Sequence, residues 1–483
     1  MKAGVLDEIK GKYGDRATDA PYECSLYSRD LAPVPALLVD PLFNTMPDLV
    51  VRPANMEEVA EILRTAWTEN IPVTPRAGAS TVYFDTVPVK GGVVMDLNLL
   101  RGVVRLDEER MTVTVQAGTT WSELDDYLNR RGLTVKSYPS SAPGASIGGW
   151  FCMMGYGIGS LKYGSLLSQV RSAEVVLATG EVKVLTKETD PPLSWFAASE
   201  GTLGIVTSLE LEVRKLTPMK HFLMRIANIP EMTRVLSELK DAPVTPYNLH
   251  FADPACMRAM HDLGLIPDDI QDGCILEIDY EGSDRELAQA EDVIRAMAAD
   301  NITINMLPSE IAAMEWEERF KALRLKRGGP SVLGGEVWLP TDELADYLAD
   351  INKMSLSYGI NLISYGHVVT PKHATVMTMF YADETKTIKY IFNLSLVKKI
   401  QDIGYRHQGY PYGVGLWNTP YINRIYSRKQ LNELRERKKA LDPKSILNPG
   451  KVYRSPLLMN PFTFGIGMDV LAGILRAAGR GGR

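Results

Sequence analysis

The spacing of apolar and polar residues first predicts a region of mixed helices and strands. Leu49–Val51 is a short apolar run, typical of a buried strand. Asn55 and the acids that follow it form a helix start, after which apolar residues recur at the spacing of one helix face. The same reading predicts strands at 71–75, 92–97 and 112–116, a helix at 121–131 and a hairpin around 179–180. Many short strands with Gly-rich turns indicate a domain of mixed α and β structure.

After Pro218 the pattern changes to longer alternating strands and helices. One set of elements runs over 222–298 and a second over 331–403. Two such sets predict a duplicated α+β unit with antiparallel strands, which forms a separate domain beginning near 217. A helix at 427–441 and the segment 441–452 then close the pattern.

The stretch 139–164, PSSAPGASIGGWFCMMGYGIGSLKYG, is dense in glycine yet contains many large apolar side chains. It is too apolar for a flexible linker. A tightly packed turn between core elements would explain one pair of glycines. This density favours a place where the backbone closely approaches a flat or phosphorylated ligand.

Composition and charge narrow the class of protein. The 483 residues carry a net charge of -6, which argues against a nucleic-acid-binding surface. The four cysteines lie far apart and include no CxxC pair, which argues against a zinc site, an iron–sulfur cluster or a disulfide scaffold. Neither an export signal nor an apolar run of the ~20 residues needed to cross a bilayer is visible. We therefore expect a cytoplasmic, multidomain enzyme.

Four motifs in a fixed order carry a family resemblance. They are PRAGAST at 75–81, PGASIGGW with LKYG between 143 and 164, SEGTLGIVT at 199–207, and LDPKSILNPGKV at 441–452. Any one of them is weak evidence, but the ordered set is specific. Together they resemble the vanillyl-alcohol-oxidase (PCMH-type) flavoproteins, in the branch of D-lactate dehydrogenases, glycolate oxidase flavin subunits and alkylglycerone phosphate synthase.

The resemblance implies an α+β fold in which a PCMH-type FAD-binding domain of two subdomains is joined to a cap. The cap is expected to consist of an antiparallel sheet with helices. The implied boundaries are an N-terminal extension at 1–45, the FAD-binding domain at 46–217, the cap or substrate domain at 218–440, a return to the FAD-binding domain at 441–453, and a tail at 454–483.

The resemblance also assigns the cofactor residues. Backbone amides, small side chains and hydroxyls of one loop would surround the FAD pyrophosphate. The implied FAD-binding residues are Arg76, Ala77, Gly78, Ala79, Ser80, Thr81, Pro143, Gly144, Ser146, Gly148, Gly149, Glu200, Gly201, Ile205, Asn448 and Lys451. Some relatives attach the flavin to a histidine in the phosphate loop. This loop has none, and His407 in the cap is the remaining candidate, so noncovalent FAD is expected.

The catalytic region departs from the family pattern. Relatives that act on 2-hydroxy acids have a GH…GDGNxH stretch and a GEHGxG stretch whose histidines and glutamate bind a metal. Here the first retains His367 but lacks the acidic core, and the second reads GYPYGVG at 409–415. Two histidines without a carboxylate make a weak metal site, so no metal is expected. Tyr412 and Tyr410 occupy the place of the family's base, and Arg324 lies where relatives bind the substrate carboxylate.

The expected reaction is therefore FAD-dependent dehydrogenation of a carbon that bears a hydroxyl, first of all in a 2-hydroxy acid. Hydride would pass to flavin N5 while a tyrosine or histidine takes the proton. Electrons would leave to an iron–sulfur protein or an electron-transfer flavoprotein. A phenolic or other alcohol substrate, a transferase like alkylglycerone phosphate synthase and an electron-relay subunit remain alternatives.

The tail at 454–483 is longer than relatives require. Its apolar residues from Met468 to Leu475 recur at helical spacing and are followed by arginines. Packing on its own domain is one interpretation. Docking to a partner subunit or to an anionic membrane surface is the other, which would add the membrane surface to the cytoplasmic location. The oligomeric state, including a homo-oligomer, stays open.

Overall fold

A computed structural model describes residues 2–33, 39–267, 270, 272–299, 301–453 and 461–480. Contacts group the chain into two units. The first consists of Met1–Gly155, Ser165–Leu216 and Gly413–Pro461, and the second of Tyr156–Gly164, Thr217–Tyr412 and Phe462–Arg483. The chain thus rejoins the first unit at Gly413, earlier than the predicted return at 441. At this point the Glu200 carboxylate, far away in the sequence, accepts hydrogen bonds from the amides of Val414 and Gly415.

One sheet of the first unit leads into the predicted phosphate loop, which follows one of its strands. Its strand order is β1 (Ala17–Thr18), β2 (Leu49–Val51), β4 (Val93–Asp96) and β3 (Val73–Arg76). Both β2 and β3 pair with β4 in parallel. Helices α1 (Lys2–Tyr13) and α4 (Met56–Glu69) share one apolar core with the sheet. As predicted, Asn55 caps α4, since its side chain accepts a hydrogen bond from the Glu58 amide at 2.9 Å.

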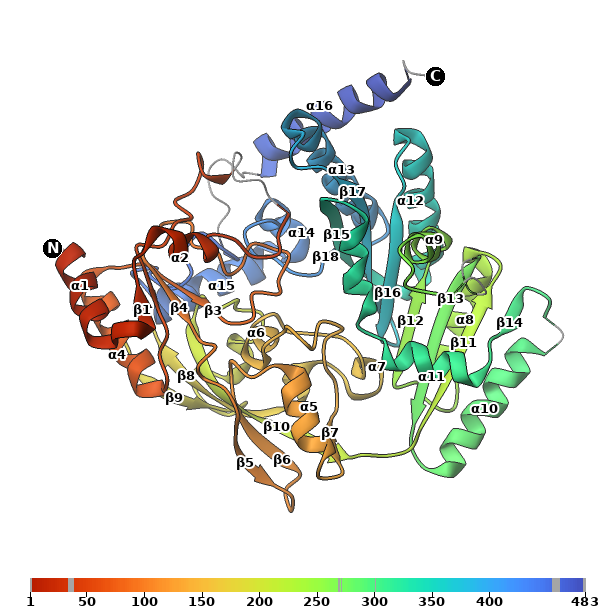
Figure 1. Cartoon of the computed structure of the whole chain (residues 1–483), viewed down its shortest axis with the longest axis horizontal. Coiled ribbons are helices and arrows are strands. Elements are labelled where there is room, and N and C mark those ends of the chain that lie inside the picture. Colours follow the sequence, from red (N-terminus) through yellow and green to blue (C-terminus); the bar gives the residue numbers. More distant parts are fainter. Residues whose placement is uncertain are drawn as a thin grey trace. The chain divides into compact units, whose positions relative to one another are not determined.

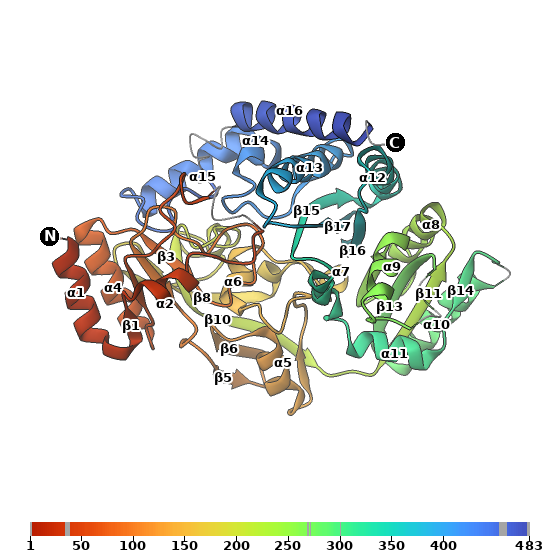
Figure 2. The ribbon, with the colours of Figure 1, turned by 45° about the horizontal axis from the view of Figure 1, so that its top comes forward.

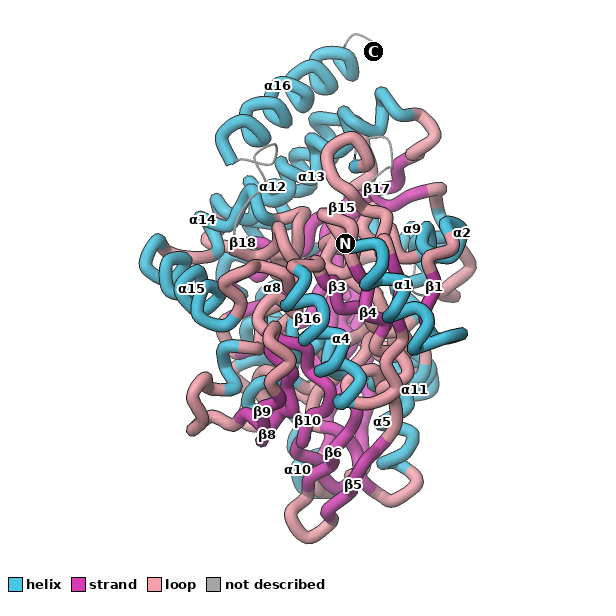
Figure 3. Tube along the Cα trace, turned by 90° about the vertical axis from the view of Figure 1, so that its left-hand side faces the viewer, coloured by secondary structure: helices cyan, strands magenta, loops and turns pink. Residues whose placement is uncertain are grey.

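The second sheet of the first unit is antiparallel. Its strand order is β5 (Val103–Asp107), β6 (Thr112–Gln116), β10 (Gly204–Lys215), β8 (Val170–Leu177) and β9 (Val182–Leu185), and β7 (Leu133–Val135) pairs with the end of β10. Figure 3 shows these strands in magenta. The predicted hairpin at 179–180 is confirmed, because β8 and β9 pair across it. Helix α5 (Trp121–Asn129) begins with a capping box formed by Thr120 and Glu123.

The second unit is built on one long antiparallel sheet (Figure 1). Its strand order is β14 (Ile304–Met306), β11 (Met219–Ile226), β13 (Cys274–Glu281), β12 (Asn248–Ala252), β16 (Ile363–Thr370), β17 (His373–Ala382), β15 (Ser331–Pro340) and β18 (Tyr410–Pro411). The two predicted sets of elements meet where β12 pairs with β16. The predicted antiparallel sheet in this part of the chain is confirmed.

The two faces of this sheet are covered differently. Helix α13 (Thr387–Arg406) packs on the face that carries Gly335 and Val337. Helix α12 (Leu344–Tyr358) lies on the same face, where the Tyr347 hydroxyl contacts the Thr378 hydroxyl at 2.9 Å, and α8 (Ile229–Lys240) packs against α12. On the opposite face, α9 (Pro254–Asp262), α11 (Ser309–Glu317) and the turn Lys321–Gly328 cover an apolar part of the sheet. Polar side chains of β11, β13, β12 and β16 lie on that same opposite face.

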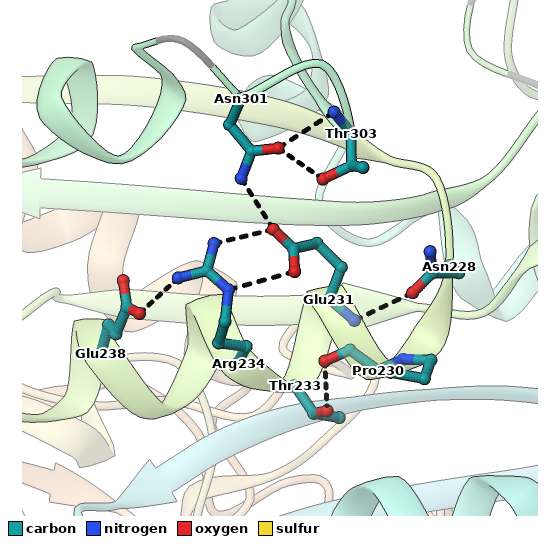
Figure 4. A network of polar contacts seen from close by, with 8 residues as sticks. All are labelled: Asn228, Pro230, Glu231, Thr233, Arg234, Glu238, Asn301 and Thr303. Atoms are coloured by element: carbon teal, nitrogen blue, oxygen red, sulfur yellow. Dashed lines mark hydrogen bonds and ion pairs between the residues drawn. The ribbon is translucent and has the colours of Figure 1, made fainter.

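Helix α8 is fixed to the turn before β14 by a polar network (Figure 4). Asn228 caps the helix by accepting from the Glu231 amide at 3.0 Å. The Glu231 carboxylate in turn accepts from Arg234 and from Asn301, each at 2.7 Å. These hydrogen bonds lower the pKa of Glu231 to about 2. The network thus fixes α8 to the segment between α10 (Asp284–Ala298) and β14.

The C-terminal helix α16 (Pro461–Arg480) lies along α13 (Figure 2). Asp469 bridges Lys398 at 2.9 Å and Lys399 at 2.6 Å. Ile466, Val470 and Ile474 recur every fourth residue and are about half exposed. Part of the predicted tail, 454–460, lies outside the described residues, so its docking role stays a prediction. Among the described helices, none is long and apolar enough to cross a membrane.

Candidate active site

The structure brings two of the predicted FAD-binding segments together. The loop 77–81 follows β3, and Gly78 lies directly against the segment at Gly144. A Cβ atom at Gly78 would stand 2.1 Å from the Gly144 carbonyl oxygen, so a larger residue would force the two segments apart. Gly78 in PRAGAST is therefore required for the close approach of this loop to the backbone of PGASIGGW.

The phosphate loop offers an unused set of donors. Within the described residues, no backbone N–H from Gly78 to Thr81 donates to a protein oxygen, and the Ser80 hydroxyl is also unengaged. Consecutive amides with a hydroxyl fit a pyrophosphate. Arg76 is different, because its guanidinium donates to the Arg29 carbonyl at 2.7 Å and lies over the Tyr27 ring.

The segment 143–149 contacts the phosphate loop at Gly144 and also leads into a short helix. Ser146 caps the short helix α6 (Ile147–Cys152), accepting from the Gly149 amide at 3.2 Å. The Gly148 amide donates to the Ala117 carbonyl at 2.9 Å, and a Cβ at Gly148 would stand 2.6 Å from the Ala117 Cβ. Pro143 directly precedes Gly144 at the contact with Gly78. Contacts of these residues with FAD stay predictions.

The last two predicted segments form a buried clamp inside the first unit. Asn448 donates from its amide to the Glu200 carbonyl at 2.8 Å and to the Asp85 carbonyl at 3.1 Å. Lys451 donates to the carbonyls of Asp85 and Val87 and to the Asn448 side chain, all within 2.7 Å. The structure thus uses all three predicted residues to hold together loop segments that are distant in the sequence.

Gly201 and Ile205, from the same motif, have packing contacts. Gly201 has a positive φ of 68° and lies where a Cβ would stand 2.5 Å from the Pro75 ring. Ile205 is 1% exposed and belongs to the core under the first sheet. An adenine-binding role for either residue stays a prediction.

Two aspartates that the sequence did not single out complete the clamp. Burial, followed by the charge of Asp85, raises the pKa of Glu200 well above its ordinary value. Burial lowers the pKa of Lys451 to about 8 and raises that of Asp30 to about 6. One Asp85 carboxylate oxygen is buried without a hydrogen-bond partner among the described residues. The ammonium of Lys451 therefore lies among three acids, Asp30, Asp85 and Glu200, and offsets their charge.

The raised pKa of Asp30 predicts how stability depends on pH. An unfolded aspartate titrates near ~3.9, so the folded state binds the Asp30 proton more tightly. This contribution to stability is full below pH ~4 and is lost as the pH rises through about 6. Replacing Asp30 by asparagine should therefore flatten the fall in unfolding free energy over this window by ~1–3 kcal/mol. Urea unfolding across this pH range measures it. Asp126→Asn, at an exposed position, is the control, and identical profiles for all three proteins would contradict the prediction.

In the second unit, strand alternation places a row of polar side chains on the face that carries α9 and α11. Successive residues of a strand point to opposite faces, and the register aligns these residues across adjacent strands. The row consists of His221 on β11, Glu277, Asp279 and Glu281 on β13, Asn248 and His250 on β12, and His367 on β16. His367 is the predicted catalytic member, and the other residues were not singled out from the sequence.

Contacts within this row are specific. His367 Nδ1 lies 3.2 Å from Asn248 Oδ1, and its ring centroid is 4.7 Å from that of His250. His250 Nδ1 lies 3.4 Å from a Glu277 carboxylate oxygen. Burial, with His250 nearby, lowers the pKa of His367 well below its ordinary value. His367 is therefore a neutral imidazole, only partly buried, whose Nε2 has no partner among the described residues.

The predicted tyrosines lie in an aromatic cluster around Trp338. The rings of Tyr410 and Tyr412 stack on Trp338, and Tyr156 meets it edge-on at 4.6 Å. The Tyr412 hydroxyl accepts from the Tyr156 amide at 2.7 Å and donates to the Tyr156 carbonyl at 3.3 Å. Burial raises the pKa of Tyr412 far above its ordinary value. This hydroxyl is thus committed to the backbone.

Among the described residues, no hydrogen bond or ion pair joins the two remaining candidates, Arg324 and His407, to the polar row. Arg324 lies exposed on the turn Lys321–Gly328. His407 is held by two carboxylates, with Nδ1 3.0 Å from Glu343 and Nε2 3.3 Å from Asp350. Among the described residues, no group of three His, Cys, Asp or Glu side chains is arranged to hold a metal ion. The expectation of a metal-free site stays a prediction.

Comparison with known proteins adds the chemical context. A family model described as an FAD binding domain matches residues 47–186, and one described as the C-terminal domain of FAD linked oxidases matches 219–452. The glycolate oxidase subunit GlcD of Bacillus subtilis is 28% identical over 86% of this chain and 90% of its own length. The mitochondrial D-lactate dehydrogenase [cytochrome] of Arabidopsis thaliana is 26% identical over 84% of this chain and 73% of its own.

Two solved structures share the fold. An alkyldihydroxyacetonephosphate synthase superposes with a TM-score of 0.75 at 20% identity, covering 93% of this chain and 86% of its own. A p-cresol methylhydroxylase superposes with a TM-score of 0.80 at 16% identity, covering 94% and 97%. These similarities confirm the predicted α+β fold with a PCMH-type FAD-binding domain and the predicted cofactor, FAD.

Proposed function

Because the chain belongs to the FAD-linked oxidases and carries both of their domains, we propose that it dehydrogenates a 2-hydroxy acid and passes the electrons to a separate electron-transfer protein. The chain is an FAD-dependent oxidoreductase. The named substrates of its relatives, glycolate and D-lactate, support the hydroxy acid as the substrate class.

The observation that carries the proposal is the neutral, partly exposed imidazole of His367. When bound, FAD accepts a hydride, which brings both electrons of the substrate C–H bond. The chain must then take the hydroxyl proton as the C–O bond becomes a carbonyl. His367 Nε2 is available for that proton, whereas the Tyr412 hydroxyl is engaged on both sides by Tyr156.

The direct test is identification of the product. Purified enzyme with an artificial electron acceptor is incubated with glycolate or with each enantiomer of lactate, and the 2-oxo acid is trapped as its hydrazone. The proposal predicts stoichiometric 2-oxo acid from at least one of these substrates. Absence of any 2-oxo acid, from enzyme that retains FAD, would contradict it.

A specific observation favours a second candidate, a neutral alcohol or phenol. Glu277, Asp279 and Glu281 occupy alternate positions of β13 and point to the same face as His367. Carboxylates on that face disfavour an anionic substrate more than a neutral one. Primary alcohols and phenolic alcohols therefore belong in the same assay, with the aldehyde or ketone as the product.

The commitment of the Tyr412 hydroxyl predicts a mild variant. Tyr412→Phe removes two hydrogen bonds to Tyr156 and leaves the half-buried Tyr156 amide without its acceptor, which lowers the unfolding free energy by ~1–3 kcal/mol. Because the hydroxyl is not the base in this proposal, the rate of flavin reduction should change by less than ~3-fold. Thermal unfolding and anaerobic stopped-flow absorbance measure the two effects. Loss of flavin reduction with FAD still bound would contradict this prediction and indicate that Tyr412 is the base.

A further inference from the structure

We propose that Asn248, Asp279 and His221 are positioning residues that hold His367 in the tautomer with the proton on Nδ1. Nε2 is then left as a lone pair for the substrate hydroxyl. The inference rests on the proposed role of His367. It adds three residues that lie on the next three strands of the same sheet, Asn248 on β12, Asp279 on β13 and His221 on β11.

The direction of the hydrogen bonds follows from the donors available. Asn248 Nδ2 donates to Asp279 Oδ2 at 2.8 Å, because a carboxylate oxygen accepts. The amide orientation is thereby fixed, with its Oδ1 facing His367 Nδ1 at 3.2 Å. An amide oxygen can only accept, so His367 Nδ1 must carry the proton.

Asp279 is in turn oriented by His221. The second carboxylate oxygen of Asp279 lies 2.7 Å from His221 Nδ1, and Asp279 itself is 0% exposed. The His221 ring stacks on Trp316 at a centroid distance of 5.3 Å, which limits its rotation. Polar contacts therefore connect His221 to Asp279, Asp279 to Asn248 and Asn248 to His367, and each residue orients the next.

The titratable groups around His367 are compatible with this assignment. His250 stands beside it on β12 and contacts Glu277 on β13, and both point to the same face. Asp279 is separated from His367 by the Asn248 amide. An uncharged amide next to the imidazole fixes its tautomer without adding a charge, so the ring stays neutral before the substrate binds.

The experiment combines a direct measurement of the tautomer with kinetics on the FAD-loaded full chain. Histidine is labelled with nitrogen-15, and the His367 signals are assigned by their loss in His367→Gln. Nitrogen shifts then show which ring nitrogen carries the proton, without substrate. The expected result is a protonated Nδ1 in the wild type and a mixture of tautomers in Asn248→Leu.

The kinetic arm separates positioning from a purely structural role. Asn248→Leu is expected to lower the rate of flavin reduction by ~10²-fold with FAD retained. Asn248→Asp keeps an oxygen acceptor beside Nδ1. Its carboxyl group faces the Asp279 carboxylate, so the two share one proton that takes the place of the lost amide donor. This variant should therefore recover most of that loss. Asn305→Leu, at an exposed site on β14, is the matched control.

The outcomes distinguish this inference from the proposed function. A wild-type His367 protonated on Nε2, or an Asn248→Leu enzyme that reduces flavin at the wild-type rate, would overturn the inference. A wild-type enzyme that forms no 2-oxo acid would overturn the proposed function, and the nitrogen spectra would still decide the tautomer.

Discussion

Replacing His367 by glutamine is expected to slow flavin reduction by the substrate by ~10²-fold or more, with FAD still bound. Glutamine keeps a group that can hydrogen-bond to Asn248 but has no nitrogen that accepts a proton near neutral pH. The loss should therefore fall on the chemical step and not on folding. Anaerobic stopped-flow absorbance at about 450 nm follows flavin reduction directly.

The matched control for this variant is His373→Gln. His373 lies on the adjacent strand β17, where its Nδ1 faces the Thr370 hydroxyl at 3.3 Å, outside the row that contains Asn248. We expect this change to alter the rate by less than ~3-fold. If both variants lost the same fraction of the flavin-reduction rate, or if His367→Gln were as fast as the wild type, His367 would not be the proton acceptor.

Replacing Lys451 by methionine is expected to lower the unfolding free energy of the first unit by ~3–5 kcal/mol. The side chain is 3% exposed and its ammonium donates to three oxygens. Methionine fills a similar volume but removes the cation that offsets Asp30, Asp85 and Glu200. Urea unfolding of the FAD-loaded protein, followed by the release of flavin, measures the change.

Lys439→Met provides the control, since Lys439 is exposed on α15 (Arg428–Leu441) near the same segment. It should shift stability by less than ~0.5 kcal/mol. The two variants remove the same charge. A comparable loss of stability in both would show that the Lys451 ammonium does not stabilise the clamp by offsetting the acids around it.

Much of the fold could be predicted from local patterns. The apolar run Leu49–Val51, the Asn55 cap and the hairpin at 179–180 each depend on residues close together in the chain, and each appears where it was predicted. The point where the chain rejoins the first unit has no such signal. It depends on the Glu200 carboxylate binding amides more than 200 residues away.

In the candidate site, too, some features could be predicted from the sequence and others could not. The glycine motifs indicated close approach of the backbone to a ligand, and that approach stays a prediction. What the structure shows is a backbone contact inside the protein, where Gly78 lies against Gly144. The environment of Tyr412 could not be predicted, because its partner Tyr156 is 256 residues away. The polar row was within reach of the sequence. In CILEIDYE at 274–281, Glu277, Asp279 and Glu281 alternate with apolar residues, which is the signature of a strand with one polar face.

The central claim is that this FAD enzyme takes hydride from a hydroxyl-bearing carbon. The most direct measurement is the anaerobic absorbance spectrum of the purified protein titrated with D- and L-2-hydroxy acids, primary alcohols and phenolic alcohols. We expect loss of the flavin band at about 450 nm with one substrate class, complete at one equivalent of substrate per FAD. A bound flavin whose spectrum none of these compounds changes would contradict it.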